Sequence, residues 1–202
     1  MFTGIVQAMG TVVSVTKTSD GLRLVMDPGD WDHAPSLGDS IAHNGCCLTL
    51  VAIEDGHWVY EAIPETIVKT TIGTWTPGQR INLERSLRMG DGLDGHQVQG
   101  HVDGVGTILS VDDADEYRIR IGIAGLNMKW MVPKGSICID GVSLTLAAVN
   151  DDEQWVEVTL IPETLARTNL GDRTKADGVN IEGDVLVKTI VTTMERMQGI
   201  SV

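Results

Sequence analysis

The chain has 202 residues, 42% of them hydrophobic, and a formal net charge of −13. Because nucleic acids are bound through basic surfaces, this charge argues against a nucleic-acid partner. No stretch approaches the roughly 18 consecutive apolar residues of a membrane span, and the N-terminus lacks the basic and apolar regions of a signal peptide, so we expect a cytoplasmic protein.

The first half of the chain has the pattern of short strands punctuated by glycine. Residues 41–50, IAHNGCCLTL, predict two strands joined by a tight bend at Gly45. A short helix is expected from Pro64 to Gly73, because helices favour proline at the start and glycine just past the end. Further segments rich in Val, Ile, Leu and Thr, as strands are, occupy residues 10–15, 22–26, 58–62 and 80–84.

The second half repeats these elements at an offset of 96 to 98 residues. Residues 137–146, ICIDGVSLTL, place Gly141 96 residues after Gly45, and IPET recurs at 63–66 and 161–164. A repeat this long is a duplicated domain, because solenoid units have about 20–50 residues. The matching strands are 107–111, 117–121, 155–159 and 178–182, and the matching helix runs from Pro162 to Gly171.

Six short antiparallel strands in each half are expected to close into a barrel, since closure removes exposed edges. The predicted fold class is mainly β, with two similar six-stranded antiparallel Greek-key β-barrels plus a C-terminal α-helix. The predicted domains are residues 1–97, 98–185 and 186–202. A turn or two of helix is also expected over 125–133, and the acidic run 112–116 is expected to be a solvated hairpin loop.

The C-terminal helix lies outside both repeats. It is expected over 185–198, with Asp184 as its N-cap. Its apolar stripe either packs on its own barrel or joins one chain to another. The stripe follows helical spacing and consists of Val187, Ile190, Val191, Met194 and Met197.

The Leu-Thr-Leu strands predict two equivalent binding faces. Because alternate side chains of a strand face opposite sides, the leucines should point into each barrel. Cys47 and Thr49 then look outward, as do Ser143 and Thr145. Unpaired N–H groups at the first turn of each Pro-Glu-Thr helix would meet the polar atoms of a flat heterocycle lying there. The alternative is that the Glu and Thr side chains only cap their own helices.

The two halves differ where the chemistry is expected. His101 stands where the first half has Ile5, and with Asp103 close in sequence it is a candidate acid or base near neutral pH, although a lone histidine is more often structural. Cys47 is a candidate nucleophile, but its counterpart is Ser143 and no basic residue is evident nearby, so a reactive thiol is not established. Three cysteines, with no C-x-x-C spacing, predict neither a disulfide framework nor a zinc site.

Five motifs, in order and at consistent spacing, resemble the riboflavin synthase family. They are MFTGIVQ at 1–7, AHNGCCLT at 42–49, GHQVQGHVDG at 95–104, IDGVSLT at 139–145 and IPET at 161–164. The resemblance spans residues 1 to about 185 and includes the trailing helix. Gln99 departs from it, because a small hydroxyl residue would also suit that position, which leaves the local hydrogen bonding open.

The resemblance implies two lumazine-binding barrels, a homotrimer gathered by the C-terminal helix, and no cofactor or metal. It implies the dismutation of two molecules of 6,7-dimethyl-8-ribityllumazine to riboflavin and 5-amino-6-(D-ribitylamino)uracil by transfer of a four-carbon unit, the last step of riboflavin biosynthesis. The active site would lie between the N-barrel of one subunit and the C-barrel of its neighbour. An association with lumazine synthase is also expected.

Carried over position by position, the resemblance assigns one set of residues to each barrel. His101 is expected to transfer protons, with Cys47, Ser143 and Thr145 positioning or polarising the substrate. The N-barrel site would use Gly4, Ile5, Val6, Cys47, Leu48, Thr49, Ala62, Ile63, Pro64, Glu65 and Thr66, with Phe2 and Thr3 near the junction. The C-barrel site would use Gly100, His101, Val102, Lys134, Ser143, Leu144, Thr145, Ile161, Pro162, Glu163 and Thr164.

Two other functions remain open at this point. A non-catalytic lumazine or flavin carrier, or an optical antenna, would have the same barrels but needs only one competent site. A purely structural pair of barrels would leave the matched polar faces unexplained. Since both halves keep Gly-x-x-Leu-Thr and Pro-Glu-Thr, the sequence favours the enzyme.

Overall fold

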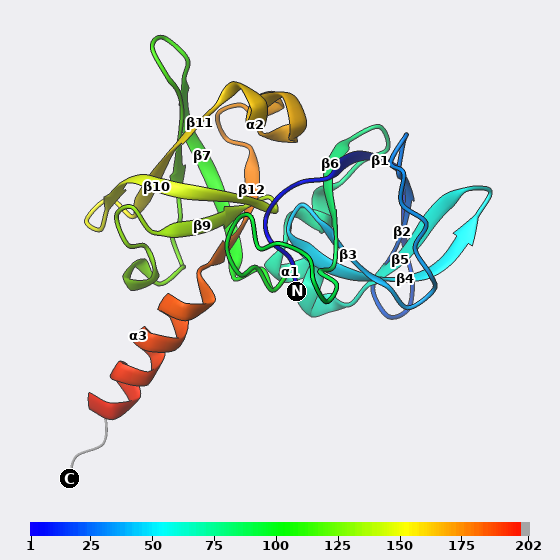
Figure 1. Ribbon diagram of the computed structural model, residues 1–202, viewed down its shortest axis with the longest axis horizontal. Coiled ribbons are helices and arrows are strands. Elements are labelled where there is room, and N and C mark those ends of the chain that lie inside the picture. Colours follow the sequence, from blue (N-terminus) through cyan, green and yellow to red (C-terminus); the bar gives the residue numbers. More distant parts are fainter. Residues whose placement is uncertain (199–202) are drawn as a thin grey trace.

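The computed structural model describes residues 1–198, which form two β-barrels and a C-terminal helix that extends away from them (Figure 1). Residues 199–202, at the end of the predicted third domain, lie outside the described residues. The predicted fold class is confirmed: each half closes into a six-stranded antiparallel barrel.

The N-barrel has the strand order β1-β2-β5-β4-β3-β6, so β3, β4 and β5 run back in reverse order between β2 and β6, a Greek-key path. The tight turn at Gly45 joins β3 to β4, as predicted from IAHNGCCLTL. Its strands are β1 (Ala8–Lys17), β2 (Leu22–Asp27), β3 (Ser40–His43), β4 (Cys46–Glu54), β5 (His57–Ala62) and β6 (Arg80–Arg85).

The C-barrel repeats this ring, with the order β7-β8-β11-β10-β9-β12. The Leu-Thr-Leu alternation holds in both barrels: Leu48 and Leu146 are buried, whereas Thr49 and Thr145 are exposed. Its strands are β7 (Gly104–Asp112), β8 (Tyr117–Gly122), β9 (Ser136–Ile139), β10 (Val142–Asn150), β11 (Trp155–Leu160) and β12 (Gly178–Gly183).

The two Pro-Glu-Thr helices are shorter than predicted. The expected helix over 64–73 divides into α1 (Pro64–Lys69) and a 3-10 helix, η1 (Thr71–Thr74). Thr70 causes the break, because its backbone is extended while its hydroxyl donates to the Thr66 carbonyl at 2.7 Å and accepts from Ile72 N. The second repeat breaks in the same way at Thr168, between α2 (Pro162–Arg167) and η3 (Asn169–Asp172). The turn expected over 125–133 is reduced to η2 (Met128–Trp130).

The barrels meet across a polar interface related by the repeat. The Gly45 and Gly141 turns touch, so that a Cβ on either glycine would lie 2.7 Å from the other's nitrogen. Asn82 Nδ2 donates to the Asp140 carbonyl at 2.9 Å, and its repeat partner Asn180 donates to the Asn44 carbonyl at 2.8 Å. Buried amide groups need hydrogen-bond acceptors, and each of these amides finds its acceptor in the other barrel. The two bonds therefore hold the barrels in a nearly symmetric arrangement.

Helix α3 (Val185–Gln198) projects from the C-barrel as a stalk (Figure 1). Asp184 caps it as predicted, since its carboxylate accepts from Leu186 N at 2.8 Å. None of its residues is buried. Among the stripe residues, Val187 and Val191 are half-buried while Ile190, Met194 and Met197 are exposed, and Leu186 extends the exposed set. Within residues 1–198, no helix is long and apolar enough to cross a membrane.

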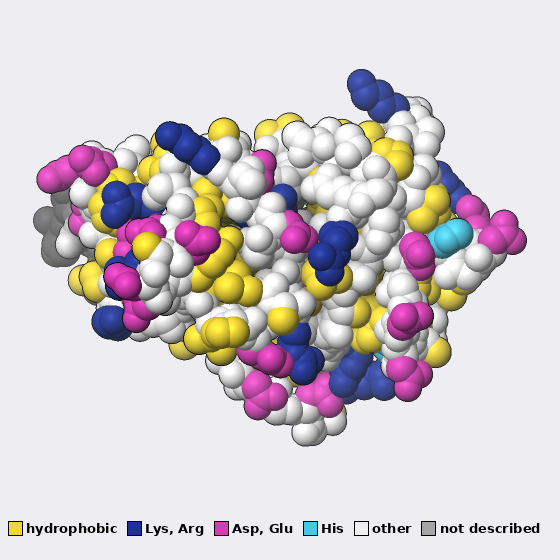
Figure 2. Space-filling model, turned by 90° about the horizontal axis from the view of Figure 1, so that it is seen from above, with side chains coloured by type: hydrophobic (Ala, Val, Ile, Leu, Met, Phe, Trp, Pro, Cys, Tyr) yellow, Lys and Arg dark blue, Asp and Glu magenta, His cyan; other side chains and the backbone are white. Residues whose placement is uncertain are grey.

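Charges of both signs are mixed over the molecule. On the face drawn in Figure 2, acidic and basic side chains are interspersed, with apolar side chains between them. Some of the surface charges are paired, as in Arg23–Glu54 and Lys129–Glu195, whose charged atoms are 2.6 and 2.7 Å apart.

Candidate functional site

The segments that precede each barrel cross to the opposite barrel. We call residues 2–6 the N-leader and residues 98–102 the C-leader. They pair with each other at one point, where Phe2 N donates to the Val98 carbonyl at 2.7 Å. Beyond it, Ser143 N of the C-barrel donates to the Gly4 carbonyl at 2.7 Å, and Cys47 N of the N-barrel donates to the Gly100 carbonyl at 2.9 Å.

Packing confirms the exchange. Val6 of the N-leader is part of the C-barrel core cluster, and Val102 of the C-leader packs against the N-barrel core. The residue sets expected for the two sites therefore change. Residues 4–6, expected at the N-barrel site, lie next to Ser143 of the C-barrel, and residues 100–102, expected at the C-barrel site, lie next to Cys47 of the N-barrel. The repeat in the sequence is the same whether each leader packs on its own barrel or on the opposite one. The sequence therefore could not distinguish the two arrangements.

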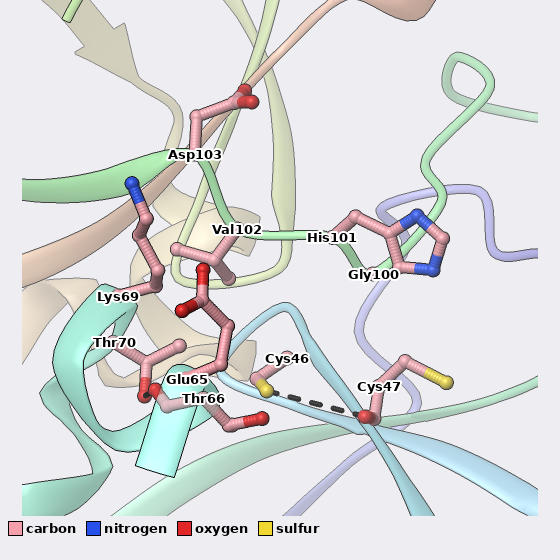
Figure 3. A pocket seen from close by; sticks show the side chains of 10 residues that line it. All are labelled: Cys46, Cys47, Glu65, Thr66, Lys69, Thr70, Gly100, His101, Val102 and Asp103. Carbon is pink, nitrogen blue, oxygen red and sulfur yellow. Dashed lines mark hydrogen bonds between the residues drawn. The ribbon is translucent and has the colours of Figure 1, made fainter. Parts of the chain in front are cut away.

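The larger pocket, of about 340 Å³, lies against the N-barrel. Figure 3 shows the ring of His101 and the thiol of Cys47 on one side of it, and the α1 side chains Glu65 and Lys69 on the other. We call it the N-pocket. It is lined by Cys46, Cys47, Glu65, Thr66, Lys69, Thr70, Gly100, His101, Val102 and Asp103.

A second pocket, of about 160 Å³, lies against the C-barrel, and we call it the C-pocket. All of its lining residues have a repeat counterpart in the N-pocket, with Ile5 standing for His101, Ser143 for Cys47 and Arg167 for Lys69. The chain therefore builds the same site twice with different chemistry. The C-pocket is lined by Gly4, Ile5, Val6, Val142, Ser143, Glu163, Thr164, Arg167 and Thr168.

His101 is an exposed side chain at the edge of the N-pocket. The proximity of Asp103 in sequence does not become a His–Asp pair. The Asp103 carboxylate instead accepts from Lys188 Nζ at 2.8 and 2.9 Å and from Gly183 N at 2.8 Å. His101 therefore lines the pocket without that carboxylate as its orienting partner. Asp103, which directly follows the C-leader, instead binds helix α3 through Lys188.

The two adjacent cysteines have different environments. Cys46 is buried, and burial raises the pKa of its thiol to about 12, so this thiol stays protonated and packs as a small apolar group. Cys47 is half-buried and faces the pocket. No lysine, arginine or histidine forms a hydrogen bond with the Cys47 sulfur within residues 1–198.

Some of the expected site residues line neither the N-pocket nor the C-pocket. Phe2 is fully buried where the leaders meet, and Thr3 is held by Glu84. Lys134 is exposed, with φ +65°, and donates its backbone N–H to the Leu146 carbonyl. Leu48 and Ala62 are buried in the N-barrel core, and Leu144 packs against the C-barrel core. The other expected residues that line neither pocket are Thr49, Ile63, Pro64, Thr145, Ile161 and Pro162.

The sequence analysis missed His96, which contacts Ser143 at the C-pocket. The His96 Nδ1 and Ser143 Oγ atoms are 2.7 Å apart. Burial lowers the pKa of His96, so the imidazole is neutral near pH 7 and able to exchange a hydrogen bond with the hydroxyl. A comparison of the repeats passes over His96, because it precedes the C-leader, where the matched positions of the two halves begin.

The repeats did carry the signal for two other missed positions. Lys69 and Arg167 stand at matched places in the last turns of α1 and α2 and line the two pockets. Arg167 pairs with Glu163. Each pocket thus has a cation and a carboxylate on its helical wall. No group of three or more His, Cys, Asp or Glu side chains that would hold a metal ion occurs in residues 1–198.

Comparisons with known proteins match this architecture. The family model described as "Lumazine binding domain" matches twice, at residues 3–86 and 99–184. A protein of Mycobacterium tuberculosis (strain ATCC 25618 / H37Rv) named riboflavin synthase is 39% identical over 201 residues, covering 96% of this chain and 98% of that protein. A riboflavin synthase of Chlamydia muridarum (strain MoPn / Nigg) is 40% identical over 200 residues, covering 98% of both chains.

Solved structures of LumP are also similar. The crystal structure of LumP complexed with riboflavin has a TM-score of 0.81 at 27% identity, covering 91% of this chain and 99% of that one. LumP complexed with 6,7-dimethyl-8-(1'-D-ribityl) lumazine has a TM-score of 0.79 at 28% identity, covering 90% and 98%. The double-barrel arrangement is thus shared with proteins solved with a lumazine or a flavin.

Proposed function

The chain belongs to the riboflavin synthase family and is an enzyme built from two lumazine-binding repeats, and we propose that it catalyses the dismutation of 6,7-dimethyl-8-ribityllumazine. One lumazine donates a four-carbon unit to the other, giving riboflavin and 5-amino-6-(D-ribitylamino)uracil. The atoms of two lumazines equal those of the two products, so the reaction needs no oxidant, reductant or second substrate.

A single observation carries the proposal: the chain has two pockets whose lining residues correspond position by position. A reaction between two copies of one substrate needs two sites of the same shape. A carrier or antenna needs one, so this duplication favours the enzyme over the non-catalytic alternative. The differences between the pockets, His101 against Ile5 and Cys47 against Ser143, suit two bound molecules that play unequal parts.

The chemistry follows from the substrate. The C7 methyl group of a lumazine is acidic, because its carbanion delocalises into the ring, so one bound molecule must lose that proton. The other becomes electrophilic when a nucleophile, such as water or its own ribityl hydroxyl, adds to it. We assign proton transfer to His101, with Cys47 and Ser143, which line the pockets, positioning or polarising the substrates. We assign the same role to Thr145, which lies two residues after Ser143 on the outer face of β10. Holding two rings face to face supplies much of the rate, since effective molarities reach about 10⁵–10⁸ M.

We expect purified protein mixed with 6,7-dimethyl-8-ribityllumazine, without added cofactor, to form riboflavin at half the molar amount of lumazine consumed. Absorbance and chromatography measure both species, and a reaction without protein is the control. Tight binding with no turnover above that control would favour the carrier instead.

The assembly we propose is a cytoplasmic homotrimer joined through α3, with each active site formed by the N-pocket of one subunit and the C-pocket of its neighbour. The exposed stripe of Leu186, Ile190, Met194 and Met197 supports it, because an apolar stripe on a projecting helix is stabilised by burial against another chain. We also propose the domain limits 1–97, 98–185 and 186–202, and an association with lumazine synthase.

If α3 joins the trimer, charged side chains introduced into its exposed apolar stripe should separate the subunits. Ile190→Glu combined with Met194→Glu should convert a species of about 65 kDa, three times the chain mass of 21.8 kDa, to a monomer, because two carboxylates would be buried without partners. Turnover should be lost with it. Light scattering and the lumazine assay check both.

Arg196→Glu is the matched control, since it makes the same change of two charges on α3 away from the stripe and should keep the trimer. If the double variant stayed trimeric, or if a folded monomer kept full turnover, α3 would not be the interface that completes the site.

A further inference from the structure

Two buried glutamates at matched places in the repeat have no role in the chemistry described so far. Glu84 lies near the end of β6 in the N-barrel and is 4% exposed. Glu182 lies at the matching place on β12 in the C-barrel and is 2% exposed. Among residues 1–198, neither carboxylate forms an ion pair with a lysine or arginine within 4 Å. A buried carboxylate must therefore be stabilised by hydrogen bonds.

Each carboxylate takes its hydrogen bonds from the leader of its own barrel. Glu182 Oε1 accepts from Gln99 N at 2.7 Å, and Oε2 accepts from Gly100 N and His101 N, both at 2.9 Å. Glu84 accepts from Thr3 N at 2.6 Å, from the Thr3 hydroxyl at 2.8 Å and from Gly4 N at 3.0 Å. Each leader is thus bound to its own barrel at one carboxylate.

The same leader residues bind the opposite barrel through their carbonyl groups. Gly100 links Glu182 to the backbone of Cys47, and Gly4 links Glu84 to the backbone of Ser143. These links are tight, because a Cβ on Gly100 would lie 2.6 Å from the Cys47 Cβ, and a Cβ on Gly4 would lie 2.7 Å from the Ser143 Cβ. Moving a carboxylate therefore moves the edge of a pocket that belongs to the other barrel.

We propose that Glu182 and Glu84 are crossed positioning residues: Glu182 of the C-barrel holds His101 and Cys47 in place in the N-pocket, and Glu84 of the N-barrel holds Gly4 and Ser143 in place in the C-pocket. The consequence for turnover rests on the proposed function, whereas the effect on the pocket edge does not. Burying these groups costs free energy, since burial raises the pKa of Glu84 and raises that of Glu182 to about 7. The leader N–H bonds offset part of that cost.

The reactivity of Cys47 tests the crossed arrangement in ligand-free protein. Cys46 and Cys138 are buried and burial raises the pKa of both thiols, so iodoacetamide should modify the half-buried Cys47 first. In Glu182→Gln an amide replaces an acceptor of three N–H bonds, and the C-leader should loosen. We expect modification of Cys47 to be faster by about tenfold, because the amide keeps only one acceptor oxygen and the loss of N–H bonds favours local opening.

Two matched variants separate positioning from general destabilisation. Glu84→Gln removes the equivalent carboxylate, and Glu157→Gln removes a buried carboxylate that instead binds Arg118 and Arg120 outside both pockets. Both should leave Cys47 modification within about twofold of the wild-type rate, since neither carboxylate contacts the C-leader. An unchanged rate in Glu182→Gln, or equal acceleration in all three variants, would overturn the proposal.

If Glu182→Gln does not fold, Gln99→Thr tests whether Glu182 positions the C-leader. It supplies the hydroxyl donor that Thr3 gives to Glu84, so Cys47 modification should become slower, and an unchanged rate would contradict the proposal. Lumazine turnover is measured in parallel, with kcat expected to fall more than KM changes in Glu182→Gln and Glu84→Gln. Because modification needs no lumazine, a wild-type protein without turnover would refute the proposed function and leave this test intact.

Discussion

Arg173→Met should lower the free energy of unfolding by about 3–5 kcal/mol, because it leaves a buried carboxylate without its counter-charge. Arg173 Nη2 donates to Asp140 Oδ2, and the side chains are 13% and 0% exposed. Asp140 Oδ1 also accepts from Asn180 N at 2.8 Å at the interface between the barrels. Urea unfolding at one protein concentration measures the loss.

The first repeat supplies the rescue. It has Asn44 where the second has Asp140, and Asn44 Oδ1 accepts from Asn82 N at 2.8 Å, so an amide serves this place without a cation. Asp140→Asn in the Arg173→Met background should recover most of the lost stability. A cost below about 1 kcal/mol for Arg173→Met, or no recovery in the double variant, would mean that the pair is not what stabilises this interface.

The decrease in the free energy of unfolding caused by Arg173→Met should also depend on pH. Burial raises the pKa of Asp140 above its ordinary 3.8, while Arg173 opposes the rise, so removing Arg173 raises the pKa further. A raised pKa in the folded state destabilises only above the pKa of the unfolded state, where the unfolded chain has released the proton. The difference between Arg173→Met and wild type should therefore be small near pH 4 and grow toward pH 7.

His101→Ala should lower lumazine turnover by about 100- to 10,000-fold, the range for losing a general acid or base. His101 is the only titratable side chain that the C-leader, residues 98–102, brings to the N-pocket, and the repeat places Ile5 there in the C-pocket. KM should change much less than kcat, because the lost interaction acts on the proton in the transition state. Steady-state kinetics on the assembled protein measure both.

The control for His101→Ala is His57→Ala, which removes a histidine that lines neither pocket and should keep wild-type turnover. Added imidazole should restore part of the activity of His101→Ala, since the vacated space lies at an exposed edge. Near-normal turnover of a folded, assembled His101→Ala protein would remove the proton-transfer role from this residue.

Much of the fold follows from local patterns. The alternation in LTL sends Leu48 into the core and leaves Thr49 outside, and the glycine bends mark where β3 meets β4 and β9 meets β10. The helices were overestimated because Thr70 and Thr168 bond to the carbonyls four residues earlier while their own backbones are extended. In each case a threonine hydroxyl competes with the N–H groups of the helix for a carbonyl. This competition is local, but a prediction based only on proline at the start of the helix and glycine past its end does not include it.

The sequence by itself determined the duplication, the strand periodicity, the outward polar faces and the family, because each depends on residue types at fixed spacing along the chain. Only the tertiary structure decided that residues 100–102 complete the N-pocket, that His96 contacts Ser143, and that Asp103 binds Lys188 instead of orienting His101. Those contacts join residues 47 to 85 positions apart in the chain. Which distant segments meet is determined by how two near-symmetric barrels pack, and in a duplicated chain the repeat pattern allows either leader on either barrel.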